Sequence, residues 1–316
     1  MSPTFTGYVL AGSALLLFAT GILVTRAAAA RVNLGLGFLV ATSTNVVFSA
    51  LALAVQLTWQ HAEASPAIGW NGRAFLLFAL AGAFSTYLGR WFFYESVVRF
   101  GAAKASIFQV SSPLFTALMA WAVLGEKLSL AAGIGMALTV AGLMLVGLKP
   151  GALSKARGPS ATGVRAGFVQ TALASVFLLG LGGSLAYAVG NVLRGMAIRS
   201  WNEPVLGGLV GASCGLLLHL LFNRDKANVA AGLQAADRTG LWLFGVMGIC
   251  TISAQILTIA AMRFIPLAIA TLITLCTPLI VFPLSRWLLK AHDDFTALML
   301  TGSAMAMLGI VLVVLR

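Results

Sequence analysis

Ten long apolar segments follow one another along this chain, and they constrain its fold more than any other feature. They lie at about residues 7–25, 34–57, 74–97, 102–124, 129–148, 172–193, 204–222, 240–261, 266–289 and 296–315. A helix needs about 20 apolar residues to cross a bilayer, whereas strands of a membrane β-barrel are about half as long and alternate in polarity. Only 9% of the residues are charged, against roughly 25% in soluble domains. The sequence therefore predicts an all-α membrane protein with ten transmembrane helices.

The segments between these runs are short, and the longest ones, at about 59–72, 149–167 and 223–238, leave no room for a soluble domain. We expect the first apolar run to be a retained helix, because no basic side chain precedes it and no clear cleavage site ends it. The net charge of +12 comes from Lys and Arg residues at helix ends and in loops. There they face anionic lipid head groups, so membrane lipids are expected partners and nucleic acid is not.

The cysteines and the short motifs indicate neither a metal site nor a cofactor. Cys214, Cys250 and Cys276 all lie inside apolar runs, without the spacing of a disulfide framework or a zinc site. The chain contains no phosphate-binding loop, so ATP is not expected to drive its activity. It also lacks the motifs of metalloproteases and serine hydrolases and any pair of carboxylates within a span, so no catalytic residues and no enzymatic activity are predicted.

A polar stripe followed by proline occurs twice in the chain, in the fourth and ninth apolar runs. The first copy reads SIFQVSSP, over Ser106–Pro113, and the second reads TLITLCTP, over Thr271–Pro278. Aligned at the two prolines, the polar pairs are Ser106 with Thr271, Gln109 with Thr274, and Ser112 with Thr277. With 3.6 residues per turn, each trio lies along one face of a helix.

The similarity extends well beyond the stripes. FATGILVTR (Phe18–Arg26) resembles YAVGNVLRG (Tyr187–Gly195), and VVRFGAAKA (Val97–Ala105) resembles AMRFIPLAIA (Ala261–Ala270). The chain is therefore predicted to hold two five-helix units, at 1–150 and 167–316, joined by a Gly- and Pro-containing linker at 151–166. Because five is odd, the second unit crosses the membrane in the opposite sense, an inverted repeat found in many secondary transporters.

The run SVVRFGAAKASIFQVSSPLFTALMAWAVLGEKLS (Ser96–Ser129) resembles the EamA family of the drug/metabolite transporter superfamily. The similarity rests on an Ala-rich turn, a proline within the helix and a Gly-Glu pair before the next helix. It implies ten helices around a central cavity lined by helices one, three, four, six, eight and nine, and transport of small solutes by alternating access. Two departures leave the substrate class open: the second unit has LKAHDD (Leu289–Asp294) in place of LGE, and the first helix lacks a Trp common in the family.

Each proline removes one helical hydrogen bond, so Pro113 frees the carbonyl of Gln109 and Pro278 frees that of Thr274. An unpaired carbonyl in lipid is costly unless a neighbour, water or solute satisfies it. We therefore predict Pro113 and Pro278 as hinges and the two stripes as substrate-binding. The alternative is a kinked helix whose Ser and Thr hydroxyls bond their own backbone.

Further candidates lie on three other helices. Tyr187 and Asn191, on a face shared with Ser184 and Arg194, and Gln255, on a face shared with Thr251 and Thr258, are predicted to bind substrate; interhelical hydrogen bonding is the alternative. Arg90 lies about two turns inside its span, and ionisable residues at such depth are functional candidates. Arg90 favours a solute with an anionic group.

The predicted function is a secondary transporter of small polar metabolites, such as amino acids, in the cell inner (plasma) membrane. A non-transporting membrane scaffold and a drug or cation exporter of the same superfamily are the alternatives, although spans one and six contain no Asp or Glu to exchange a cation for a proton. We expect a monomer or homodimer. Orientation stays open, because Lys and Arg are more numerous in the loops that follow odd-numbered spans, which places the termini outside, whereas the resemblance places them inside.

Overall fold

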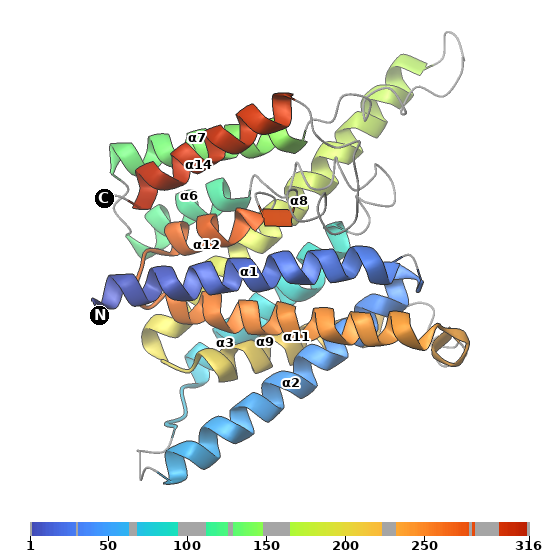
Figure 1. Cartoon of the computed structure of the whole chain (residues 1–316), viewed down its shortest axis with the longest axis vertical. Helices are drawn as coiled ribbons and strands as arrows, with labels where there is room; N and C mark the ends of the chain where they lie inside the picture. Colours follow the sequence, from blue (N-terminus) through green and yellow to red (C-terminus); the bar gives the residue numbers. More distant parts are fainter. Residues whose placement is uncertain are drawn as a thin grey trace.

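In the computed structural model, the described part of the chain is entirely helical (Figure 1). The description covers residues 2–29, 31–62, 68–93, 112–125, 129–147, 165–222, 232–277, 280–281 and 297–314. The helices are α1 (Pro3–Ala29), α2 (Leu34–Ala62), α3 (Gly72–Ala81), η1 (Gly82–Gly89), α6 (Ser112–Leu124), α7 (Leu130–Gly147), α8 (Arg165–Ser200), α9 (Pro204–Phe222), α11 (Arg238–Ala261), α12 (Leu267–Leu275) and α14 (Ala297–Val314).

Five described helical segments are long and apolar enough to cross a membrane. They are Pro3–Thr25, Gly35–Ala62, Gly72–Phe93, Pro204–Phe222 and Arg238–Ala261, and the shorter apolar helices include Ser112–Leu124 and Leu130–Gly142. The chain is therefore a multi-pass membrane protein. The sixth apolar run, expected at about 172–193, lies inside a longer helix, since α8 extends from Arg165 to Ser200, and Arg194 lies within this helix.

The helices pack in pairs that join the two halves of the sequence. α7 lies beside α14, α1 lies beside α11, and α3 with η1 lies beside α8 (Figure 1). Glycines allow the closest of these approaches. A Cβ atom at Gly309 would lie 2.5 Å from the carbonyl oxygen of Gly135, and a Cβ at Gly142 would collide with the carbonyl of Gly302. The same glycine-to-carbonyl contact is therefore made twice between α7 and α14.

Two buried phenylalanines repeat this pattern elsewhere in the bundle. The Phe78 ring of α3 packs against Gly207 of α9, where a Cβ would lie 2.5 Å from the ring, and the Phe244 ring of α11 occupies the space beside Gly37 of α2. Both rings are essentially fully buried. Each phenylalanine ring thus occupies space that is free only because the facing residue is glycine. In each pair, the phenylalanine and the glycine come from opposite halves of the chain.

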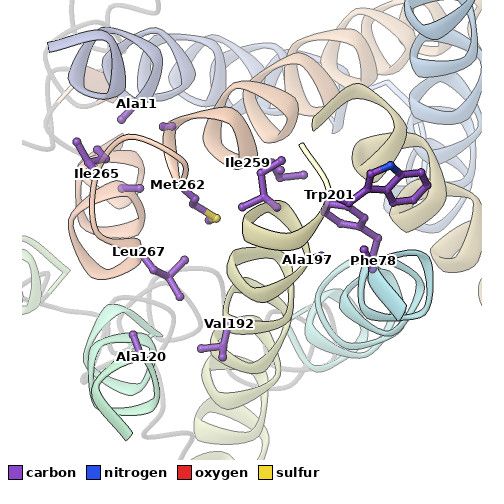
Figure 2. Close-up of a cluster of buried hydrophobic side chains, with 14 of the residues drawn as sticks. Ala11, Phe78, Ala120, Val192, Ala197, Trp201, Ile259, Met262, Ile265 and Leu267 are labelled. Atoms are coloured by element: carbon purple, nitrogen blue, oxygen red, sulfur yellow. The ribbon is translucent and has the colours of Figure 1, made fainter. Parts of the chain in front are cut away.

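An apolar cluster fills the end of the bundle at which α3 and α12 begin and α8 and α11 end. Its members include Ala11 of α1, Ala120 of α6, Val192 of α8, Ile259 of α11 and Leu267 of α12, all of them buried (Figure 2). The close-up shows these side chains converging from five helices. Burial of apolar surface contributes about 25 cal/mol per Å², so this cluster stabilises the packing of these helices against one another.

Candidate functional site

Polar side chains meet where η1 packs against α8. The stretch Gly82–Gly89 forms a π-helix that continues α3, a widened turn often found at functional sites. Within it, the buried Ser85 hydroxyl donates a 2.7 Å hydrogen bond to the carbonyl of Ala81. Gly190 of α8 lies directly opposite, since a Cβ there would be 2.7 Å from the Ser85 Cβ. The absence of a side chain at Gly190 therefore brings the two helices together at Ser85.

The Arg194 side chain lies in this contact. It is only 7% exposed. Its Nη2 donates to the Ser85 hydroxyl, and its Nη1 donates to Oδ1 of Asn191 at 3.3 Å. Side chains on a helix point toward its N-terminus, so the guanidinium reaches back along α8 by about one turn to meet Ser85. A charged group is thereby placed inside the helical bundle, held by two neutral partners.

Arg90 adds a second positive charge next to this group. It follows η1 directly, and its guanidinium lies 5.2 Å from the centre of the Phe38 ring of α2, a cation–π distance. The Phe38 ring in turn meets His219 of α9 edge-on, with the ring centres 4.9 Å apart. Arg90 is close enough to Arg194 to repel it electrostatically. Among the described residues, no carboxylate forms an ion pair with either arginine.

The threonines of the second stripe bond their own helix. Thr271 donates to the carbonyl of Leu267 at 2.9 Å, and Thr274 donates to the carbonyl of Thr271 at 3.0 Å. The carbonyl of Thr274, which Pro278 deprives of its helical donor, accepts a 2.7 Å bond from the Thr277 hydroxyl. All three side chains are buried. Their hydroxyl hydrogens are therefore occupied, and only their oxygens stay available to accept a bond.

Other buried polar atoms have no partner. Among the described side chains, the hydroxyls of Ser112 and Thr116 on α6 and the Nε2 of Gln255 on α11 make no hydrogen bond. Most buried polar groups in proteins are paired, so such atoms indicate a missing water or ligand. The helices α6 and α12 pack together, which brings Ser112 and the threonines of the second stripe to neighbouring elements. Ser112 and Pro113 are buried in the first turn of α6.

The predicted residues fall into three sets. Arg90 and Asn191 lie at the contact between η1 and α8, as does Tyr187, whose ring would be 3.2 Å from a Cβ at Gly89. Ser112, Pro113, Thr271, Thr274, Thr277 and Gln255 are buried in α6, α11 and α12. Ser106, Gln109 and Pro278 lie outside the described residues.

Sequence reasoning did not select Ser85 or Arg194 as site residues. Ser85 lies in a run of small residues with no polar periodicity. Arg194 shares the helix face of Tyr187 and Asn191, but only those two residues of the face were selected as substrate-binding. The available signal was that shared face.

Comparisons with known proteins agree with this architecture. A solved crystal structure, titled only as a protein, superimposes with a TM-score of 0.70 over 99% of this chain and 98% of its own, at 16% sequence identity. At that identity the likeness shows the fold alone. No curated protein matches the sequence. The model of the EamA-like transporter family matches residues 5–148. Residues 5–148 of this chain thus match the EamA-like transporter family, part of the drug/metabolite transporter superfamily.

Proposed function

We propose that this protein is a secondary transporter that moves small polar solutes, such as amino acids, across the plasma membrane by alternating access. In this proposal, two inverted five-helix units, at residues 1–150 and 167–316, move relative to each other around a binding site between them. The family match supports a transporter that is not an enzyme. The solute class, the membrane and the inverted arrangement belong to the proposal.

The observation that carries the proposal is the repetition of the same helix contacts with the two halves exchanged. The contact of α1 with α11 corresponds to that of α8 with α3 and η1, and α7 packs against its own counterpart α14. Phe78 with Gly207 and Phe244 with Gly37 repeat this at the level of side chains. Such repetition is expected of an inverted repeat, whose substrate site lies near the bilayer midplane at the interface of the repeats.

The buried polar atoms support a solute site at this interface. A scaffold without a solute would gain nothing from the unpaired hydroxyls of Ser112 and Thr116 or the unpaired amide of Gln255, because each such group is costly when buried. The buried Arg194 and the partly buried Arg90 disfavour the export of cations, since they would repel a positively charged solute. Neither alternative is favoured by a specific observation.

Two experiments test the transporter proposal. Purified protein in liposomes is assayed for uptake and efflux of a labelled metabolite panel, and movement of none of its members would contradict the proposal. In a cysteine-free protein, single cysteines at positions 109 and 274 are then exposed to a small water-soluble thiol reagent during transport. We expect both to react, and a cysteine at Leu51, on the outer face of α2 and 61% exposed, to serve as the lipid-facing control. Unreactive cysteines at both positions would remove the stripes from the site.

A further inference from the structure

We propose that Arg194 binds the anionic group of the transported solute, and that the solute is therefore a carboxylate-bearing metabolite. This inference rests on the proposed transport function and assigns its substrate class. The observation behind it is the environment of the guanidinium: it is nearly fully buried, and among the described residues it donates hydrogen bonds to the neutral side chains of Ser85 and Asn191.

The guanidinium has donors left over after these contacts. An arginine carries five N–H donors in a planar fork, and the hydrogen bonds to Ser85 and Asn191 use two of them, which leaves three (5 − 2 = 3) without a partner among the described residues. A carboxylate accepts two parallel N–H bonds from such a fork. Ser85 and Asn191 thus orient the guanidinium while part of its hydrogen-bonding edge stays unused.

The local charge also calls for an anion. Burying an unpaired charge in a membrane protein is costly, and Arg90 increases that cost because it repels Arg194. Among the described residues, the Glu203 carboxylate accepts from Gln56 and the Asp237 carboxylate pairs with Arg31, so neither is paired with this guanidinium. A bound carboxylate would neutralise the guanidinium and satisfy its remaining donors together.

The matching contact in the other half shows that close helix packing does not require the arginine. Gly21 of α1 faces Thr251 of α11, with a Cβ at Gly21 lying 3.6 Å from the Thr251 hydroxyl. There the residue that the sequence alignment pairs with Arg194 is Thr25, whose hydroxyl bonds the carbonyl of Gly21 at 2.7 Å. Since a glycine faces a hydroxyl residue there too, at a looser distance and with a threonine in place of Arg194, pairing of the two helices does not by itself require the arginine.

The test measures ligand binding separately from transport. Full-length protein in detergent is heated with each of the common L-amino acids, with the matched amino acid amides, and with sodium chloride or inorganic phosphate alone. The variants are Arg194→Gln, Arg194→Lys and, as a matched control on the same helix, the exposed Arg199→Gln. We expect at least one acid, but not its amide, to raise the melting temperature of wild-type protein. Arg194→Gln should lower the affinity of the protein for that acid by about tenfold or more, as expected when a charged hydrogen-bond partner is removed.

The remaining outcomes separate the inference from simpler explanations. Arg199→Gln should bind like wild type, and Arg194→Lys should bind more weakly because it keeps the charge but loses the planar fork. If Arg194→Gln does not fold, an unchanged preference for acids in Arg194→Lys overturns the inference. It is also overturned if no acid stabilises the protein, if Arg194→Gln keeps the preference, or if chloride or phosphate stabilises equally well. Transport of neutral or cationic solutes by the Arg194→Gln variant in liposomes would refute only the carboxylate assignment. The proposed transport function would still hold.

Discussion

The contact of η1 with α8 and the contact of α11 with α1 are built alike, yet they differ in charge. In each, a glycine faces a hydroxyl residue, and that hydroxyl donates a 2.7 Å bond to the carbonyl four residues earlier, Ser85 to Ala81 and Thr251 to Met247. Among the described side chains, only the first contact contains an arginine. The comparison teaches that a repeated backbone arrangement can carry different chemistry, because a side chain one turn away decides what the contact holds.

The helix caps show the same divergence at the membrane surface. Asn71 caps α3 by accepting from the Ala74 amide, and it donates to the Ser200 carbonyl at the end of α8. Asp237 caps α11 by accepting from the Thr239 amide, and it accepts from Arg31 just after α1. The same two junctions are tied in both halves, one by a neutral group and one by an ion pair.

The largest difference between the halves is expected from adding a methyl group at the matched glycines. Gly190→Ala places a Cβ 2.7 Å from Ser85 Cβ and 3.1 Å from the Ala81 carbonyl, and such overpacking costs about 1–3 kcal/mol. Gly21→Ala meets only atoms at 3.6 Å or more and gains up to about 1 kcal/mol in helix propensity. Thermal unfolding in detergent should show a lower melting temperature for the first and an equal or higher one for the second. An equal decrease in melting temperature for the two variants would show that the two helix contacts are equally tight and would contradict this prediction.

A smaller effect is expected when the hydroxyls themselves are removed. Ser85→Ala takes an acceptor from the buried guanidinium, and an unsatisfied group of this kind costs about 1–3 kcal/mol. Thr251→Val removes a bond within one helix and should cost less than about 1 kcal/mol. The melting temperatures, together with acid binding by each variant, compare the two sites. If Thr251→Val lowers the melting temperature as much as Ser85→Ala does, the hydrogen bond between Arg194 and Ser85 adds nothing to stability.

The two stripes should respond in opposite directions in solute-free protein. Thr274→Val removes a hydroxyl that bonds its own helix, and we expect a loss below about 1 kcal/mol. Ser112→Ala removes a buried hydroxyl without a partner, so stability should be unchanged or slightly higher. Unfolding of both variants is measured with and without a transported solute. Solute should stabilise wild type more than Ser112→Ala, and identical stabilisation would exclude Ser112 from the site.

The smallest effect concerns the caps and depends on pH. The hydrogen bond from Arg31 and that from the Thr239 amide lower the pKa of Asp237 below its ordinary value. The ionised carboxylate therefore stabilises the fold above the ordinary aspartate pKa, and this contribution disappears as the pH falls through the lowered value. Asp237→Asn keeps the cap and loses the charge, so it should melt slightly lower than wild type at neutral pH and equally at strongly acidic pH. Asn71→Ala, the neutral-cap control, should melt below wild type by the same amount at neutral and at acidic pH.

Much of the architecture was predictable because lipid leaves few choices. The apolar runs predicted α1, α2, α9 and α11 to within a few residues at most ends, since a backbone in lipid must satisfy its hydrogen bonds within a helix. The family assignment from the run around Pro113 is confirmed over residues 5–148. The apolar run at 172–193 covers only the middle of α8, because the polar residues at both ends of this helix (Arg165–Ser200) do not contribute to a hydrophobicity pattern.

The sequence by itself determined which segments are helical and which half of the chain each resembles, because hydrophobicity and repetition are properties of residue order. Only the tertiary structure decided where the polar groups find partners. The stripe at Thr271, Thr274 and Thr277 looks like a set of free hydroxyls in sequence, yet these hydroxyls bond their own helix. Arg194 shares a polar helix face with Asn191 in the sequence, but its contact with Ser85, some hundred residues away in the chain, is evident only in the structure. The depth and partner of a side chain depend on which helix crosses its own, and glycines at the crossing set that approach.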